Sequence, residues 1–208
     1  IDLDGTVYPN NNGIWEAMSS NIEGYMTEEL KIKPEDTYGL RKRLYTTYGT
    51  TLRGLQTEFE VDALHYLNFI HNFRAEDFIK PNQDLCTWLE TLPQPKWIFT
   101  NSDRPHAERI LAALSIRDQF EGIVDVFATE FIPKPDERAY ERAAAIVGGI
   151  TPETTLFIED SLKNLVTAKR LGWQTAWISP EEGHPSVDLT ATTLEELDIV
   201  HWSREYGD

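Results

Sequence analysis

The chain has 208 residues and a formal net charge of −16, with 40% of its residues hydrophobic and 26% charged. This length suffices for a real hydrophobic core and allows a second, smaller domain. The acidic balance excludes nucleic-acid polymers and anionic membranes as expected partners, and no apolar run approaches the ~20 residues of a membrane-spanning helix. Because the single cysteine, Cys86, can form no disulfide within the chain, we expect a reducing, cytoplasmic location.

The first six residues, Ile1-Asp2-Leu3-Asp4-Gly5-Thr6, place two carboxylates at the predicted end of a buried strand. We expect earlier residues of that strand to precede Ile1. From Ile14 to about Lys80, apolar residues recur at helical spacing, interrupted by a polar loop at Tyr48–Gly54. No strand is predicted before Pro81, so residues 10–81 are predicted to form a helical insertion.

After Pro81, short apolar runs alternate with segments of helical periodicity. Such alternation predicts a parallel sheet with helices on both faces. We therefore predict a doubly wound α/β core made of residues 1–9 and 82–208. The predicted strands are 96–100, 123–128, 155–158 and 174–178, and a last short helix is predicted at 194–200.

Polar clusters follow each of the first predicted strands in turn. Carboxyl ends of parallel strands share one edge of the sheet, where ligands bind. Taken singly, each cluster also fits a tight turn, a helix cap or a solvated lysine. Together they predict one shared site. The clusters are Asp2–Thr6, Thr100-Asn101-Ser102, Lys134-Pro135 and Glu159-Asp160-Ser161.

The four clusters, taken in chain order, resemble the four motifs of the haloacid dehalogenase superfamily. The residues that carry this resemblance are Asp2–Thr6, Thr100, Lys134 and Glu159-Asp160. Further stretches are similar to its pyrimidine 5′-nucleotidase branch. The resemblance implies a Rossmann-like core with residues 10–81 as an α-helical cap. These further stretches are Tyr48–Leu55, Thr100–Arg109 and Asp160–Asn164.

The resemblance also implies a magnesium-dependent phosphoric monoester hydrolase that works through an aspartyl phosphate. Asp2 would be the nucleophile and Asp4 the acid and base, with Thr6 holding Asp4. Lys134 would neutralise charge beside Asp2. Thr100, with the backbone amides at Asn101 and at the start of the following helix, would bind the phosphate oxygens. The implied Mg²⁺ ligands are Asp2, Asp160 and the backbone carbonyl of Asp4, with Glu159 acting through a water molecule.

The implied substrate is a small phosphorylated molecule, a pyrimidine nucleoside 5′-monophosphate, and the protein would be a monomer or homodimer. Tyr48, Thr50 and Arg53 are candidates for contacting the nucleoside, although the same residues fit a structural turn. His106 is predicted to be a surface or helix-capping histidine, and Asn164 to lie near the metal without binding it. The alternatives are a sugar-phosphate phosphatase, a phosphomutase, or a catalytically silent regulatory or scaffold protein.

Overall fold

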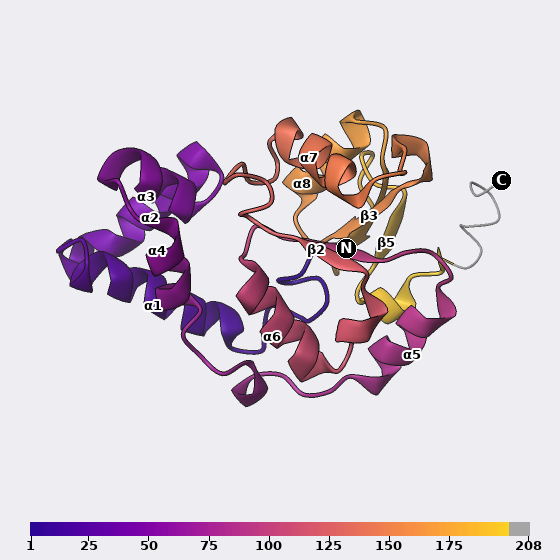
Figure 1. The fold of residues 1–208 in the computed structure, drawn as a ribbon, viewed down its shortest axis with the longest axis horizontal. Coiled ribbons are helices and arrows are strands. Elements are labelled where there is room, and N and C mark those ends of the chain that lie inside the picture. The colour runs from indigo at the N-terminus through magenta and orange to yellow at the C-terminus, as the bar shows by residue number, and fades with distance from the viewer. Residues whose placement is uncertain (200–208) are drawn as a thin grey trace.

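The computed structural model describes residues 1–199 and shows a group of helices beside an α/β part (Figure 1). The predicted helical periodicity before Pro81 is confirmed. The helices of this group are α1 (Ile14–Glu28), α2 (Pro34–Tyr48), α3 (Thr51–Phe59) and α4 (Ala63–Ile70), followed by the short 3₁₀ turn η1 (Ala75–Asp77).

Helices α1 to α4 pack on one another around a shared apolar cluster that includes Met26, Leu44 and Leu67. The amino-terminal turns of α1 do not join this cluster. Ile14 and Met18 are instead buried with the apolar core of the α/β part. Helix α1 therefore links the two apolar clusters, and the division of the chain into 1–9, 10–81 and 82–208 stays a prediction.

The α/β part alternates strands and helices as predicted. Its helices are α5 (Gln83–Thr91), α6 (Arg104–Leu114), α7 (Glu137–Val147) and α8 (Leu162–Arg170). Its strands are β1 (Trp97–Phe99), β2 (Gly122–Val124), β3 (Leu156–Glu159), β4 (Gln174–Ile178) and β5 (Leu189–Ala191). Short 3₁₀ turns lie at η2 (Arg117–Gln119), η3 (Pro152–Thr154) and η4 (Leu194–Glu196).

The first residues of the chain join two parallel groups of strands. Strand β1 pairs with β2, and β3, β4 and β5 pair in that order, all in parallel. The amide of Phe99 donates to the carbonyl of Ile1, and the amide of Asp2 donates to the carbonyl of Ile158, both at 2.9 Å. Residues 1 and 2 therefore lie between β1 and β3, so Asp2 stands in the middle of the sheet's carboxyl edge.

Alternate residues of the strands point to opposite faces of the sheet, and both faces are covered. On one face, Ile98, Ile123 and Ile158 are buried with residues of α5 and α6. On the other face, Phe99 and Phe157 are buried with residues of α7 and α8. This arrangement is the predicted doubly wound α/β fold.

The predicted loop Tyr48–Gly54 is wrong beyond Thr50. The Thr50 hydroxyl accepts a hydrogen bond from the amide of Arg53 at 3.1 Å and caps α3, which begins at Thr51. A side-chain cap of this kind satisfies amides at the start of a helix that have no partner within it. The glycine-flanked polar composition had favoured a loop, but the cap and the packing against α2 favour a helix.

Three smaller differences lie towards the carboxyl terminus. The run at 123–128 is a strand only to Val124, because Asp125 turns the chain and accepts from the amides of Arg104 and Ala128, both at 2.9 Å. Strand β5 was not predicted, since its residues are few and only partly apolar. Within the described part of the predicted helix 194–200, residues Leu194–Glu196 form the 3₁₀ turn η4 and the two residues after it are not helical, and Val200 lies outside the described residues. Within residues 1–199, no helix is both long and apolar enough to cross a membrane.

Candidate active site

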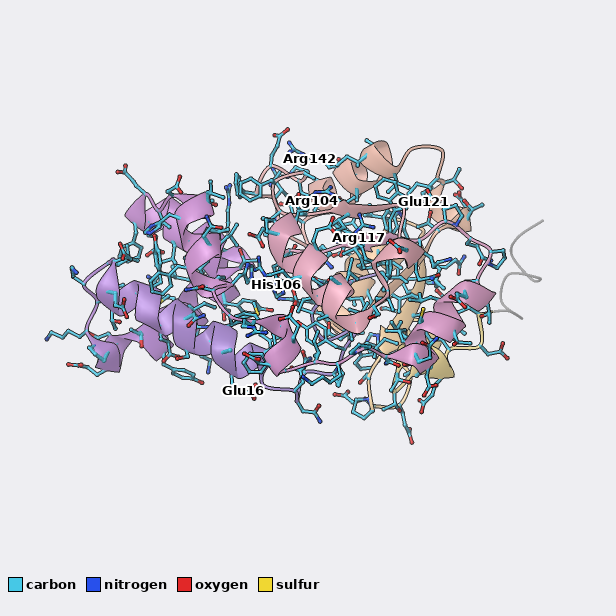
Figure 2. The ribbon with its side chains drawn as sticks, turned by 60° about the horizontal axis from the view of Figure 1, so that its bottom comes forward. Glu16, Arg104, His106, Arg117, Glu121 and Arg142 are labelled. Atoms are coloured by element: carbon cyan, nitrogen blue, oxygen red, sulfur yellow. The ribbon has the colours of Figure 1, made fainter. Side chains whose placement is uncertain are left out.

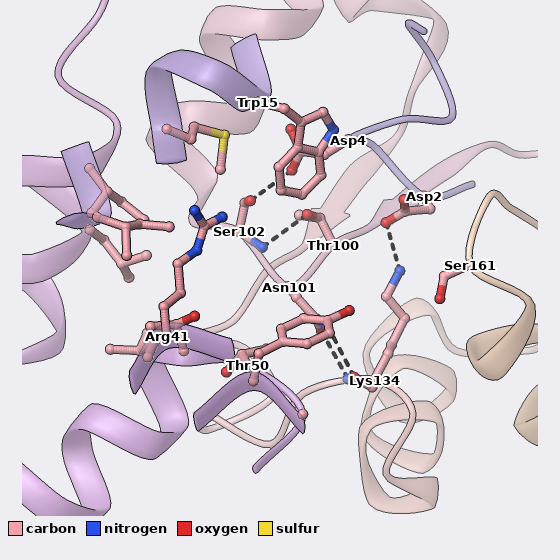
Figure 3. A pocket seen from close by; sticks show the side chains of 18 of the residues that line it. Asp2, Asp4, Trp15, Arg41, Thr50, Thr100, Asn101, Ser102, Lys134 and Ser161 are labelled. Carbon is pink, nitrogen blue, oxygen red and sulfur yellow. Dashed lines mark hydrogen bonds and ion pairs between the residues drawn. The ribbon is translucent and has the colours of Figure 1, made fainter. Parts of the chain in front are cut away.

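The strand-end clusters meet at one cavity of about 530 Å³ (Figure 3). Its walls also include residues of α1, α2 and α4. Sequence reasoning therefore placed the clusters on one edge correctly, and the structure adds the opposite wall. The cluster residues that line the cavity are Asp2, Asp4, Thr100, Asn101, Ser102, Lys134, Glu159, Asp160 and Ser161.

Lys134 is the buried cation of this site, with 1% of its surface exposed. Its ammonium donates to Asp2 Oδ1 at 2.7 Å, to Glu159 Oε2 at 2.8 Å and to the carbonyl of Phe99 at 2.7 Å. These three acceptors saturate the ammonium. Burial alone would lower the pKa of Lys134, but the two carboxylates raise it above its ordinary value, so the lysine stays charged.

Asp2 shares its surroundings with two more carboxylates. One carboxylate oxygen each from Asp2, Glu159 and Asp160 lies within 4.8 Å of the others. Burial raises the pKa of Asp2 to about 7, with a further contribution from Glu159, while Lys134 opposes the shift. Burial likewise raises the pKa of Glu159 and of Asp160. Lys134 alone does not offset three clustered carboxylates, and an all-oxygen donor set of this kind suits Mg²⁺.

The carboxylates differ in how much of their hydrogen-bonding capacity remains. Glu159 Oε2 accepts from Lys134 and from Asn164 Nδ2 at 2.8 Å, and its Oε1 accepts from the amide of Ser161 at 3.1 Å. Among the described residues, Asp160 Oδ2 accepts from Asn10 Nδ2 at 3.1 Å, and its Oδ1 accepts from the Thr6 hydroxyl at 3.5 Å. Asp2 Oδ1 accepts from Lys134, and its Oδ2 accepts a longer hydrogen bond from Thr6 at 3.3 Å. Asp2 and Asp160 are therefore held less tightly by their neighbours than Glu159, which accepts from Lys134, Asn164 and the amide of Ser161.

Thr6 does not hold Asp4, contrary to the prediction. Its hydroxyl donates to Asp2 Oδ2 at 3.3 Å and accepts from the amide of Asp160 at 3.1 Å. The tight turn at Gly5, with φ +93°, directs the chain so that Thr6 lies over these two carboxylates. Thr6 thus joins the first strand-end cluster to the fourth.

Thr100 and Asn101 hold the loops around the cavity. The amide of Ser102 donates to Thr100 Oγ1 at 3.0 Å. The side chain of Asn101 makes two hydrogen bonds with the backbone of Lys134, from Lys134 N at 2.8 Å and to Lys134 O at 3.1 Å. The Asn101 side chain is therefore engaged in positioning Lys134, and the phosphate contact predicted for its backbone amide stays a prediction.

Asp4 is surrounded by donors that sequence reasoning did not identify. Its Oδ1 accepts from the hydroxyl of Tyr8 and lies 2.7 Å from His106 Nε2, and its Oδ2 accepts from Ser102 Oγ at 2.7 Å. Burial opposes ionisation, but His106, Tyr8 and Ser102 together hold the pKa of Asp4 well below its usual range. Asp4 is therefore ionised in this arrangement.

The prediction for His106 is wrong. The side chain is fully buried, and it contacts Asp4 instead of solvent. His106 lies in the first turn of α6, immediately after the cluster Thr100–Ser102, and a side chain in a helix points back toward its amino terminus. Its place three residues after a capping aspartate was the signal that could have indicated a contact with the sheet edge.

The residues predicted to contact the nucleoside line two different cavities. Thr50 lines the main cavity, whereas Tyr48 and Arg53 line a neighbouring one. The hydroxyl of Tyr48 donates to Glu58 Oε1 at 3.0 Å. Figure 3 instead shows Trp15 from α1 and Arg41 from α2 directed into the main cavity. Helical periodicity alone could not single these two out, since it does not say which helix face meets the sheet edge.

The fold and the site define a doubly wound α/β protein with an acidic cluster and one buried lysine at the carboxyl edge of its sheet. Residues 1–172 match the family model of the haloacid dehalogenase-like hydrolases. The matched segment contains all of the strand-end clusters, and the chain belongs to this family of hydrolases.

Relatives of known sequence or structure agree with this membership. Phosphate metabolism protein 8 of Saccharomyces cerevisiae is 29% identical over 186 residues, which make up 83% of this chain and 58% of that protein. This chain therefore spans just over half the length of that relative.

Solved structures share the fold at low sequence identity. The L-2-haloacid dehalogenase of Xanthobacter autotrophicus has a TM-score of 0.62 at 16% identity, over 96% of both chains. A haloacid dehalogenase-type phosphatase of Thermococcus onnurineus has a TM-score of 0.62 at 17% identity, over 96% of this chain and 95% of its own. The hydrolase YfnB of Bacillus subtilis, which has bound magnesium, has a TM-score of 0.60 at 18% identity, with the same coverage.

Proposed function

We propose that this protein is a magnesium-dependent phosphatase that hydrolyses a small phosphomonoester, a pyrimidine nucleoside 5′-monophosphate, through an aspartyl phosphate. The observation that carries the proposal is the pair Asp2 and Asp4, with Lys134 bound to the first and hydrogen-bond donors around the second. A halide leaves without a proton, whereas an alkoxide needs one. A carboxylate at position 4 therefore favours phosphate esters over alkyl halides.

The reaction has two steps. A carboxylate oxygen of Asp2 attacks phosphorus, the bond to the leaving oxygen breaks, and that oxygen takes its electron pair and a proton from Asp4. Water then attacks phosphorus and gives a proton to Asp4, while the bond to Asp2 breaks and its electron pair returns to the carboxylate. The ionised Asp4 favoured by its contacts is the form that accepts this proton, and that proton serves the first step of the next turnover.

The residues present fit Mg²⁺. Asp2 and Asp160, with the backbone carbonyl of Asp4, would hold the ion, and Glu159 would act through a water molecule, since its own oxygens are engaged. When bound, Mg²⁺ neutralises negative charge on the phosphate. The bound magnesium of the related hydrolase from Bacillus subtilis supports this assignment.

The wall opposite the carboxylates supports a nucleotide. A cavity of about 530 Å³ falls within the range of small-ligand sites. Trp15 and Tyr38 bring aromatic rings to this wall, and the guanidinium of Arg41 points into the cavity (Figure 3), where it can donate to the carbonyl oxygens of a pyrimidine. In this proposal, residues 10–81 are the cap that covers the substrate and excludes water.

A substrate panel tests this function directly. Phosphate release is measured with UMP, CMP, AMP, GMP and glucose 6-phosphate, for the wild type and for Asp2→Asn. We expect UMP and CMP to be hydrolysed best, and the variant to lose about 10⁴-fold or more in kcat because the nucleophile is gone. Equal rates across the panel would contradict the nucleotide preference. Faster turnover of glucose 6-phosphate would favour a sugar-phosphate phosphatase, and an active Asp2→Asn variant would reject the nucleophile.

A further inference from the structure

A second buried group of titratable side chains lies next to Asp4, and one of its members, His71, also lines the main cavity. It consists of His71, Asp103 and His106, with 3%, 1% and 0% of their surfaces exposed. The two imidazole rings are stacked, with centroids 4.2 Å apart and planes inclined by 14°. His71 Nδ1 lies 2.9 Å from Asp103 Oδ1. The phosphatase steps described above use none of these three residues.

The backbone of His106 is held at the start of α6. Asp103 caps this helix by accepting from the amide of His106 at 3.1 Å. The ring then reaches the sheet edge, where Nε2 lies 2.7 Å from Asp4 Oδ1. An N–H at Nε2 can donate to this carboxylate oxygen at that distance.

The second ring nitrogen of His106 makes no such contact. Among residues 1–199, its Nδ1 is buried without a hydrogen-bond partner. Histidines in fixed orientations commonly use both nitrogens. Here, stacking on His71 and an edge contact with Phe73, at 5.9 Å between ring centroids, fix the plane of the ring instead.

His71 comes from the other part of the molecule. It ends α4, and its carbonyl accepts from Arg109 Nη2 of α6 at 3.2 Å. Figure 2 shows His106 on the side of α6 that faces the group of helices α1 to α4. Tyr8 and Ser102, the other donors to Asp4, belong to the loops that follow Asp2 and Thr100. The contact through His106 therefore ties Asp4 to the end of α4.

We propose that His106 is a positioning residue that holds the Asp4 carboxylate for proton exchange with the leaving oxygen, and that its stacking on His71 makes this orientation depend on where α4 lies. The inference rests on the proposed phosphatase function. It assigns no direct contact with substrate to His106. The helices α1 to α4 would then affect the proton transfer by Asp4 as well as substrate binding.

The leaving group provides a readout that a merely structural role would not change. A nucleoside 5′-oxygen needs the proton of Asp4 when its bond to phosphorus breaks. p-Nitrophenolate is a stable anion and leaves without it. A misplaced Asp4 should therefore slow hydrolysis of UMP much more than hydrolysis of p-nitrophenyl phosphate. The ratio of the two rates in one sample is also independent of the fraction of protein that is folded.

The experiment measures kcat and KM on both substrates for the wild type and for His106→Ala, His106→Gln and Asp4→Asn. For His106→Ala we expect kcat on UMP to fall about 10²-fold, the lower range for general acid–base catalysis, with less than about threefold loss on p-nitrophenyl phosphate. KM for UMP should change little. His106→Gln, which keeps an N–H donor, should recover part of the loss, and Asp4→Asn should show the same selectivity more strongly.

Two variants of His71 test the second half of the proposal. His71→Ala removes the stacked ring and should shift the ratio of kcat values in the same direction as His106→Ala, by a smaller factor. His71→Phe keeps an aromatic ring against His106 and should stay closer to the wild type.

The possible failures are distinguishable. A wild type that hydrolyses no phosphomonoester overturns the proposed function and this inference together. An active wild type, with the ratio unchanged in His106→Ala, overturns the positioning role alone. A shifted ratio in His106→Ala with an unchanged one in His71→Ala overturns the dependence on α4.

Discussion

At the scale of single residues, Lys134 connects stability with chemistry. Within residues 1–199 it is the only lysine or arginine that is fully buried, and it bonds both Asp2 and Glu159. Removing one partner of a buried ion pair leaves an uncompensated charge, which costs more than the pair contributes. The same ammonium that would neutralise charge near the phosphate therefore also makes the carboxylate cluster tolerable in the folded protein.

Lys134→Met should lower the free energy of unfolding by about 3–5 kcal/mol, because Asp2 and Glu159 lose their shared cation. Urea denaturation measures this loss of stability. A chelator is present so that no metal ion neutralises the carboxylates in place of the lysine. Lys169→Met is the matched control, since Lys169 pairs with Asp188 at the surface, and it should cost about 1 kcal/mol or less. The double variant Lys134→Met, Glu159→Gln should be less destabilised than Lys134→Met alone. Equal stabilities of the two single variants would contradict this account.

At the scale of elements, the contact between α2 and α3 depends on a missing side chain. A Cβ placed on Gly54 of α3 would lie 2.7 Å from Leu44 Cβ and 2.8 Å from Leu44 Cδ2 on α2. These distances are too short for carbon atoms in contact. Gly54 therefore allows the two helices to approach closely, which also explains a glycine inside a helix where the sequence suggested a loop.

Gly54→Ala should destabilise the protein, because overpacking against Leu44 costs about 1–3 kcal/mol and outweighs the gain in helix propensity. Gly39→Ala, in the exposed part of α2, is the control. A Cβ there meets nothing within 4 Å, so this change should stabilise by about 0.5–1 kcal/mol. Thermal or urea unfolding of both variants provides the comparison. If both changes stabilised the protein, the close approach of α2 and α3 would not depend on Gly54.

At the scale of the whole molecule, charge is the dominant feature. A net charge of −16 means that Mg²⁺ at high concentration will screen repulsion over the entire surface. A specific site must therefore be separated from this general effect. The ligands Asp2 and Asp160 would bind the ion in the folded state only, since they lie far apart in the chain and meet only in the fold.

Mg²⁺ should therefore raise the melting temperature of the wild type beyond the effect of NaCl at matched ionic strength. At a concentration of 100 times its Kd, a ligand that binds only the folded state adds about 2.7 kcal/mol. Asp160→Asn should lose this specific increment. Asp84→Asn removes the same charge from an exposed position on α5 and should keep it. An equal response in Asp160→Asn and the wild type would remove Asp160 from the metal site.

The sequence by itself determined the α/β core and the edge at which the site lies. Strands alternate with helices, parallel strands share their carboxyl edge, and the polar clusters at Asp2, Thr100, Lys134 and Glu159 each follow a strand. These are local signals combined with general rules of topology, so they can be read without coordinates. The helices before Pro81 could be predicted for the same reason, because periodicity is local.

Only the tertiary structure decided which side chains complete the site. Thr6 contacts Asp2 and Asp160 instead of Asp4, Arg41 rather than Arg53 enters the main cavity, and His106 lies between Asp4 and His71. Each outcome depends on how a helix or turn is rotated and seated against another element. That rotation follows from packing among residues far apart in the chain, which the spacing of residues along one element does not encode.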